Sequence, residues 1–179
     1  GSIKVERQVY IGAGSRVFEN TVIKGPVYIG DNCTIGTNTL IREGTTIGDG
    51  TTIGSYTELK DAFIMEGCEI GHFSYIGDSI IGRRCSIGAR FISATRRLDL
   101  KTVKVLVKGK LKDTGLELFG CVMGDNVRTG VGVTTNPGRL IGANSIIGPS
   151  VTLFEDVGTG KVISSKMENT EKNVGENND

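Results

Sequence analysis

The sequence predicts an all-β protein folded as a parallel β-helix, and three observations support this fold class. The first is an aliphatic residue at every sixth position without interruption: Ile11, Val17, Ile23, Ile29, Ile35, Ile41, Ile47, Ile53 and Leu59. This period is typical of a solenoid in which each repeat forms one short strand and one turn, and three repeats form one triangular coil. Neither an α-helix nor a simple sheet has it.

The residues around the aliphatic position provide the other two observations. Glycine follows it in several repeats, where we expect a tight corner to require permissive backbone angles: Gly12, Gly30, Gly36, Gly48 and Gly54. Two positions before it the side chain is small or β-branched, as expected for a strand residue that faces a narrow interior: Val9, Ser15, Thr21, Val27, Cys33, Thr39, Thr45, Thr51 and Thr57. The predicted core is therefore a prism of mainly Ile and Val side chains, and its flat faces and open ends favour a homo-oligomer.

The chain of 179 residues suits one domain, which we divide into five segments. Residues 1–8 are a lead-in that includes an apparent expression scar at Gly1 and Ser2, and residues 9–95 form coils. Within these coils the repeat shortens by one residue before Ile64 and before Ile81, which we expect to distort corners. Residues 96–120 form a projecting arm, residues 121–160 form further coils, and residues 161–179 form a polar tail that we expect to be disordered or loosely docked.

The arm interrupts the six-residue repeat but has its own pattern. Val103, Val105 and Val107 alternate with other residues, and Gly109 can turn the chain between two short strands. We therefore predict a β-arm. Segments that leave a regular solenoid often carry binding function, although a structural arm that grips a neighbouring subunit fits the same pattern.

Positive charge is concentrated around the arm. Residues 83–112 contain ten Lys or Arg residues and a single acidic residue, Asp99. Such a concentration favours a phosphorylated ligand, and the alternative is a merely solvated basic face. Phe91 is the one aromatic residue in this stretch, so there is no stacking platform and we expect no nucleic acid as a partner.

The cysteines and the hydropathy of the chain argue against several other classes. All four cysteines occupy the same position of the repeat and there is no CxxC pair, so we interpret them as core residues and expect no metal and no disulfide: Cys33, Cys68, Cys85 and Cys121. No apolar run reaches the length of about 18 residues needed to span a membrane. Because no signal peptide opens the chain either, we expect a soluble cytoplasmic protein without a membrane partner.

His72 is the only histidine, and it follows Ile70 and Gly71 just past a predicted corner. A neutral imidazole can accept a proton from an attacking amine, which is the task of a general base in acyl transfer. From spacing alone, a surface histidine is equally compatible with this position. A single histidine does exclude a zinc site built from three histidines of one chain.

The stretch EGCEIGHFSYIGDSIIG, from Glu66 to Gly82, closely resembles the active-site repeat of the C-terminal acetyltransferase domain of bifunctional sugar-1-phosphate nucleotidylyltransferase/acetyltransferases, especially the archaeal type. The resemblance covers most of residues 9–160. It implies a left-handed β-helix that forms a homotrimer, with acetyl-CoA as co-substrate. The implied acceptor is an amino-sugar phosphate, glucosamine-1-phosphate or galactosamine-1-phosphate, for UDP-N-acetylhexosamine synthesis. It also implies an N-terminal nucleotidyltransferase domain that this chain lacks.

The same resemblance implies roles for individual residues in and near this stretch. His72 in GHFSY matches the general base, and Tyr75 matches a tyrosine that contacts the sugar phosphate. Arg42 in LIREG and Lys60 in TELKDA resemble residues that bind the substrate phosphate. For Arg42 and Lys60 the alternative is a solvent-facing side chain at a corner.

Further along the chain the resemblance implies cofactor and arm contacts. Lys101 and Lys104 in DLKTVKV match paired lysines that approach a neighbouring subunit, and Val131 and Gly148 fall where backbone groups contact acetyl-CoA. Thr95 in ATRRLD stands where the family has an asparagine that helps to hold the sugar and the acetyl group. A hydroxyl does not reproduce the reach of an amide, so activity could be slower, altered or lost.

Three functions are therefore compatible with the sequence. The leading one is acetyl transfer to an amino-sugar phosphate. The second is a trimerising or regulatory β-helix of a sugar-1-phosphate nucleotidylyltransferase whose acetyltransferase site is weakened or lost, which Thr95 favours. The third is acetyl transfer to a different amine, because the fold alone does not select the acceptor.

Overall fold

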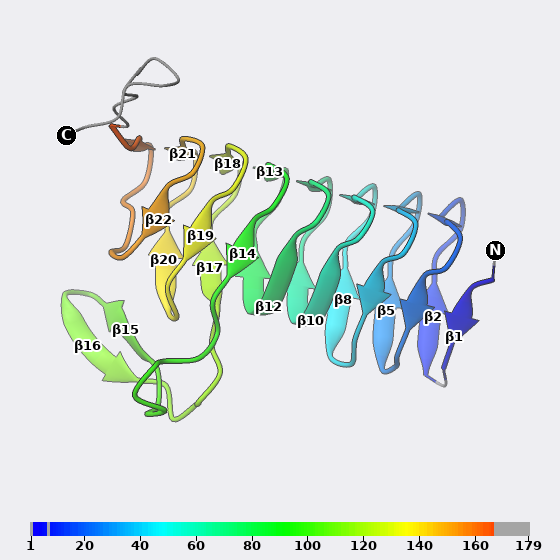
Figure 1. Cartoon of the computed structure of the whole chain (residues 1–179), viewed down its shortest axis with the longest axis horizontal. Helices are drawn as coiled ribbons and strands as arrows, with labels where there is room; N and C mark the ends of the chain where they lie inside the picture. Colours follow the sequence, from blue (N-terminus) through cyan, green and yellow to red (C-terminus); the bar gives the residue numbers. More distant parts are fainter. Residues whose placement is uncertain (1, 7, 167–179) are drawn as a thin grey trace, which may run out of the picture.

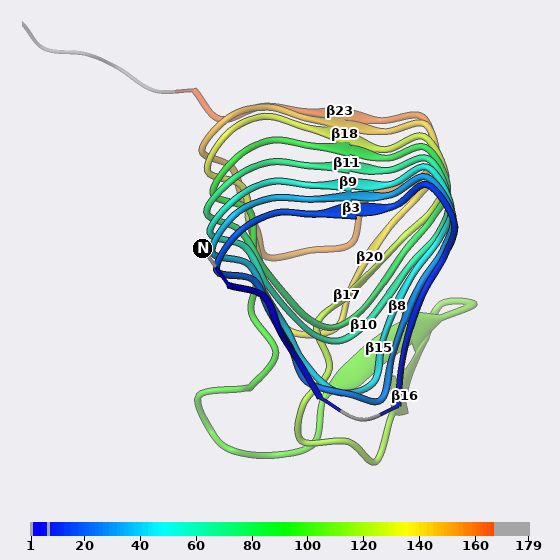
Figure 2. The same ribbon diagram turned by 90° about the vertical axis from the view of Figure 1, so that its right-hand side faces the viewer.

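The computed structural model describes residues 2–6 and 8–166, which form strands and turns and no helix. The strands stack in parallel into a straight solenoid (Figure 1), and the coils have a triangular outline when viewed along the axis (Figure 2). The predicted fold class is confirmed. No helix in the described ranges is long and apolar enough to cross a membrane.

Three faces make up the solenoid, and the chain visits them in the order face 1, face 2, face 3. Face 1 contains β1 (Lys4–Val5), β4 (Val22–Ile23), β7 (Leu40–Ile41), the first part of β10 (Glu58–Ile64), the first part of β12 (Tyr75–Ile81), β14 (Ile92–Ser93), β19 (Thr134–Thr135) and β22 (Thr152–Leu153). Face 2 contains β2 (Val9–Ile11), β5 (Val27–Ile29), β8 (Thr45–Ile47), the ends of β10 and β12, β17 (Cys121–Met123) and β20 (Arg139–Ile141). Face 3 contains β3 (Arg16–Val17), β6 (Thr34–Ile35), β9 (Thr52–Ile53), β11 (Glu69–Ile70), β13 (Ser86–Ile87), β18 (Arg128–Thr129), β21 (Ile146–Ile147) and β23 (Val162–Ile163).

The core is the column of aliphatic residues that the repeat predicts. Ile29 and Ile47 are adjacent partners in neighbouring coils, and both are completely buried. Threonines two positions before an aliphatic residue also face inward, and four of them donate to backbone carbonyls: Thr21, Thr39, Thr51 and Thr57. The narrow interior tolerates these polar side chains because they are hydrogen-bonded. Thr45 and Thr135 are exceptions, since their buried hydroxyls have no hydrogen-bond partner among the described residues. All four cysteines are buried free thiols in the same prism.

The glycines that follow the aliphatic residues have a different role from the one we expected. Gly54 does not have a positive φ. Instead, a Cβ on Gly54 would lie 2.7 Å from the backbone nitrogen of His72 and 2.8 Å from the backbone carbonyl carbon of Gly71, both in the next coil. The explanation from permissive backbone angles is therefore wrong. Glycine is required here because the corners of stacked coils approach each other too closely for any side chain.

Where the repeat shortens, a corner is replaced by a bend within one long strand. β10 and β12 each run through seven residues and pair with each other in register on both sides of the bend. Asp61 and Asp78 form these bends with φ values of 46° and 47°, a region that Asp and Asn enter more readily than most residues. The two shortened repeats thus join faces 1 and 2 into one continuous sheet.

The arm leaves the solenoid after β14 and returns at β17. Its strands β15 (Lys104–Val107) and β16 (Lys110–Asp113) form an antiparallel hairpin beside the C-terminal coils (Figure 1). Both turn residues, Lys108 and Gly109, have positive φ, as two-residue hairpin turns require. Stacking continues past the arm, because Ile80 of β12 pairs with Val122 of β17.

The solenoid is longer at both ends than we expected. Within the predicted lead-in 1–8, β1 already pairs with β4. Within the predicted tail 161–179, β23 pairs with β21, so the coils continue past residue 160. The rest of that predicted tail, residues 167–179, lies outside the described residues.

Candidate functional site

His72 lies at the corner between face 3 and face 1, which we call the His72 corner. Its side chain is exposed and borders a groove of 370 Å³ that Glu69, Ser86 and Ala89 also line. The backbone N–H of Ser55 in the preceding coil donates to His72 Nδ1 at 2.9 Å. Because Nδ1 accepts this bond, the neutral ring carries its proton on Nε2. The imidazole must therefore release Ser55 or turn before a nitrogen can accept a proton from a substrate.

Val131 and Gly148 lie on the same corner, farther along the axis. The carbonyls of equivalent corner residues accept hydrogen bonds from the next coil: His72 from the Arg90 N–H, and Val131 from the Ser150 N–H, both at 2.8 Å. Val131 is two coils beyond His72, roughly 10 Å at the usual strand spacing, and Gly148 belongs to the coil after that. The structure thus aligns three predicted site residues in one row that an extended ligand could follow.

Arg42 and Lys60 lie on the other side of face 1, at its junction with face 2, which we call the Arg42 corner. Arg42 pairs with Glu58 at 3.1 Å and with Glu43 at 3.4 Å, and the hydrogen bond to Glu58 raises the pKa of the guanidinium. Lys60 Nζ lies 2.9 and 3.1 Å from the two carboxylate oxygens of Asp78. Both predicted phosphate ligands are therefore already paired with carboxylates.

Tyr75 connects the two corners because it lies on face 1 in β12. Its phenol covers the position that a side chain on Gly77 would occupy, and Gly77 is the register partner of Lys60. The three residues of face 1 from Tyr75 to Gly77 span roughly 10 Å, and the corner residues Phe73 and Ser74 lie between them and His72. Within one chain, Tyr75 and Lys60 are together, and His72 is apart from them.

Thr95 and the two lysines of the arm lie on the segment that follows β14. Thr95 is half-buried at the base of the arm, where its carbonyl accepts the Phe119 N–H at 2.9 Å. Lys101 and Lys104 are exposed and border a pocket of 500 Å³ with Arg97 and Asp99. Two guanidinium nitrogens of Arg97, Nε and Nη2, donate to the Asp99 carboxylate at 2.7 and 2.6 Å. This contact holds the pKa of Asp99 well below its usual range.

Sequence reasoning missed the carboxylates Glu58 and Asp78 and the backbone donor of Ser55. A signal for them exists, because these contacts join residues 16 to 18 positions apart, which is one coil. Applying the coil length to charged residues would have placed Asp78 beside Lys60. No group of three or more His, Cys, Asp or Glu side chains suited to a metal ion occurs in the described part of the chain.

Comparisons with known proteins agree with this architecture. The chain is 41% identical over 104 residues to a bifunctional sugar-1-phosphate nucleotidylyltransferase/acetyltransferase of Sulfurisphaera tokodaii, covering 58% of this chain and 26% of that protein. It is 36% identical over 112 residues to the bifunctional protein GlmU of Methanocaldococcus jannaschii, covering 63% of this chain and 27% of that protein. It is also 39% identical over 153 residues to the uncharacterized acetyltransferase YaiX of Escherichia coli K12, covering 86% and 66%.

The chain therefore spans about a quarter of the length of the first two relatives, at 26% and 27%. Among solved structures, LpxA of Bacteroides fragilis, a UDP-N-acetylglucosamine acyltransferase, aligns with a TM-score of 0.60 at 17% identity, covering 87% of this chain and 66% of that one. This likeness shows the left-handed β-helix fold. The profile of the GMPPB C-terminal domain matches residues 23–139. The predicted resemblance is confirmed, and the chain belongs to the GMPPB C-terminal domain family.

Proposed function

We propose that this β-helix transfers an acetyl group from acetyl-CoA to the amine of an amino-sugar-1-phosphate, with glucosamine-1-phosphate and galactosamine-1-phosphate as the candidate acceptors. The observation that carries the proposal is the row of His72, Val131 and Gly148 along one corner. Relatives named as bifunctional nucleotidylyltransferase/acetyltransferases support it. The product would feed UDP-N-acetylhexosamine synthesis.

In the proposed reaction the sugar amine attacks the thioester carbonyl carbon directly. His72 takes a proton from the amine, the carbonyl oxygen becomes an oxyanion, and the C–S bond breaks as the CoA thiolate leaves. The Val131 N–H makes no backbone hydrogen bond within residues 2–6 and 8–166, which leaves it available to the oxyanion. Before this step His72 must exchange its bond from Ser55 for one from the amine.

Phosphate binding in this proposal uses residues from more than one chain. Face 1 separates His72 from Lys60 and Tyr75, while Lys101 and Lys104 project on the arm. A homotrimer in which the arm reaches the neighbouring subunit would place these cations beside the His72 corner of that subunit. Thr95, at the base of the arm, would hold the sugar through its hydroxyl.

The acetyltransferase is tested by mixing the chain with acetyl-CoA and either amino-sugar phosphate, and following free thiol. Release that depends on the sugar supports the proposal, and release should fall with unphosphorylated glucosamine. Light scattering should give a mass of three chains of 19.0 kDa. A monomer with full activity would contradict the shared site.

A second candidate is a trimerising or regulatory β-helix that follows a nucleotidyltransferase domain, with a weakened acetyltransferase site. The pairing of Arg42 and Lys60 with carboxylates favours it, because both cations are already neutralised. Thr95 favours it as well. Sugar-phosphate binding without sugar-dependent thiol release would support this candidate. For either function we propose a cytoplasmic location, since four free thiols suit a reducing compartment.

A further inference from the structure

The His72 corner carries three large side chains in successive coils, at positions where the backbone is left-handed. Tyr56, Phe73 and Arg90 have φ values of 58°, 57° and 62°. In the coil before them, Asn38 occupies the same position, and asparagine enters this region more readily than aromatic or long side chains. The turn alone therefore does not explain the large residues, and their place in the coils around His72 indicates a role in the site.

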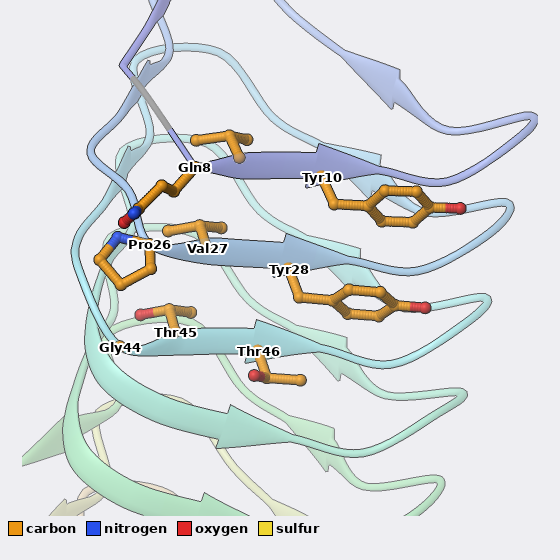
Figure 3. Close-up of a pocket in the computed structure, with 9 residues that line it drawn as sticks. Gln8, Tyr10, Pro26, Val27, Tyr28, Gly44, Thr45 and Thr46 are labelled. Carbon is orange, nitrogen blue, oxygen red and sulfur yellow. The ribbon is translucent and has the colours of Figure 1, made fainter.

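The two rings at this corner form a stacked pair. The centroids of Tyr56 and Phe73 are 5.0 Å apart and their planes are at 11°. A second stacked pair, Tyr10 and Tyr28, projects from face 2, and Figure 3 shows both of its rings pointing the same way. These two residues lie in the middle of strands that pair in register, an arrangement in which cross-strand aromatic pairs are favourable. Strand pairing thus accounts for the pair on face 2 but not for the pair at the corner.

One face of the Phe73 ring is left open by the stack. Tyr56 belongs to the preceding coil and covers one face, so the opposite face is directed along the axis toward the coil of Arg90. Phe73 is 59% exposed, and it directly follows His72 in the chain. An open apolar face beside the proposed base suits the carbon-bound hydrogens on one side of a sugar ring.

Arg90 is a free cation at the same corner. It is exposed, and its guanidinium makes no hydrogen bond or ion pair with the other residues of the ranges 2–6 and 8–166. Its backbone N–H donates to the His72 carbonyl, so it lies one coil beyond the proposed base. The neighbouring corner positions carry no acidic side chain: Ser55, Tyr56, His72, Phe73 and Ala89. At the Arg42 corner, by contrast, both cations are paired with carboxylates.

The spacing along the corner favours the acceptor over CoA as the source of a phosphate for Arg90. Arg90 is one coil step of about 4.8 Å from His72. The amine and the phosphate of a 2-amino-sugar-1-phosphate are on adjacent ring carbons, about 4 Å apart. The pantetheine arm of CoA is as long as about four extended residues, which keeps the first phosphate of CoA about 14 Å from the thioester.

We propose that Arg90 and Phe73 form the acceptor subsite beside His72. The guanidinium binds the phosphate of the amino-sugar-1-phosphate, and the open face of Phe73 packs against the sugar ring, which places the amine at the imidazole. Arginine suits this role because its planar guanidinium can donate two parallel hydrogen bonds to a phosphate. This inference rests on the proposed acetyl transfer for the identity of its ligand, and it provides a phosphate ligand on the same chain as the base.

Calorimetric titration of the full chain with glucosamine-1-phosphate, galactosamine-1-phosphate, glucosamine and CoA tests the subsite. Asparagine is the suitable replacement, because Asn38 shows that this corner accepts it with a positive φ. Arg90→Asn should weaken the binding of the sugar phosphates about tenfold or more and reduce its salt dependence, while the affinities for glucosamine and CoA stay unchanged. Phe73→Asn should weaken glucosamine and glucosamine-1-phosphate by a similar, several-fold factor, because the ring contacts the sugar and not the phosphate.

Two variants control for the loss of a charge or a ring elsewhere on the surface. Arg16→Asn removes an exposed arginine of face 3 that is also unpaired within the described ranges. Tyr28→Leu removes one ring of the stacked pair on face 2. Neither variant should change the affinity for any of the four ligands.

The subsite is overturned if both amino-sugar phosphates fail to bind the unchanged protein at millimolar concentration, or if Arg90→Asn binds them as tightly as the unchanged protein. It is also overturned if Arg90→Asn weakens CoA instead, which would assign the arginine to the cofactor. Arg90-dependent binding without sugar-dependent thiol release would retain the subsite and refute acetyl transfer. Thiol release with an unchanged KM for the sugar phosphate in Arg90→Asn would retain acetyl transfer and refute the subsite.

Discussion

Replacing Asp78 by Asn should strengthen the binding of a phosphorylated sugar. Lys60 Nζ lies 2.9 and 3.1 Å from the two Asp78 oxygens, and the two side chains are only 16% and 12% exposed. A phosphate that binds Lys60 must therefore compete with this carboxylate. Asparagine keeps the shape of the side chain and tolerates the φ of 47° at this bend, but it removes the charge.

The size of the effect follows from the pair that is broken. A hydrogen bond between charged groups contributes about 1.5–3 kcal/mol, which is the free energy that Lys60 gives up when it turns to a phosphate. Without the Asp78 charge, affinity for the sugar phosphate should rise about 10- to 100-fold. The free energy of unfolding should fall at the same time by about 1–2 kcal/mol, because the ammonium of Lys60 loses its partner at low exposure.

Calorimetric titration with glucosamine-1-phosphate and with glucosamine separates charge from shape. The gain should appear for the phosphorylated ligand alone. Asp61→Asn is the matched control, since Asp61 forms the same bend one coil earlier with a φ of 46° and without an ion pair in the described ranges. Equal or weaker binding of glucosamine-1-phosphate to the Asp78→Asn variant would refute Lys60 as a phosphate ligand.

Further expectations concern the proposed base, the coil contacts, the thiols and the arm. His72→Ala should lower the acetyl-transfer rate about 10²-fold or more and leave the affinity for the acceptor unchanged. An unchanged rate would contradict the assignment of His72 as the general base. Gly54→Ala should lower the melting temperature in thermal circular dichroism by about 5 °C, because the added Cβ meets the next coil at a cost of about 2 kcal/mol; an unchanged temperature would contradict the close approach. Burial raises the pKa of Cys121 from 9.0 to about 11. Its contribution to stability is therefore complete below pH 9 and is lost as pH rises from 9 to 11. Denaturant titrations should therefore show that the free energy of unfolding falls less between pH 9 and pH 11 in Cys121→Ala than in the unchanged protein. Changing Lys101 and Lys104 together to Ala should weaken sugar-phosphate binding and reduce its salt dependence. Binding equal to that of the unchanged protein would exclude the arm as a phosphate-binding site.

Much of the fold could be predicted because one periodic constraint determines it. A side chain such as Ile35 must fill the prism wherever the repeat places it, so the column of core residues follows from counting. The glycine corners show the limit of this reasoning. Gly54 is conformationally ordinary, and its restriction comes from His72 and Gly71 one coil away. Reasoning about the backbone angles of a single turn cannot predict such a contact between two coils.

The candidate site was less predictable for a related reason. The resemblance supplied His72 and Lys60 as members of one site, and the coil geometry places them at opposite edges of face 1. The pairing of Lys60 with Asp78 depends on where two flexible side chains meet, which the repeat does not specify. The fold is a property of the periodic pattern, whereas the site depends on its exceptions.

The arm has a consequence for how the chain folds. It increases the separation of stacked partners from 17 residues, as between Glu58 and Tyr75, to 42, as between Ile80 and Val122. The entropy of closing a loop grows only with the logarithm of its length, so the longer connection costs less than about 1 kcal/mol. The coils before and after the arm can still find each other as a nearly continuous stack. An arm of different length or sequence could therefore be inserted at this point with little effect on the assembly of the coils, and the chemistry of the arm is free to vary independently of the scaffold.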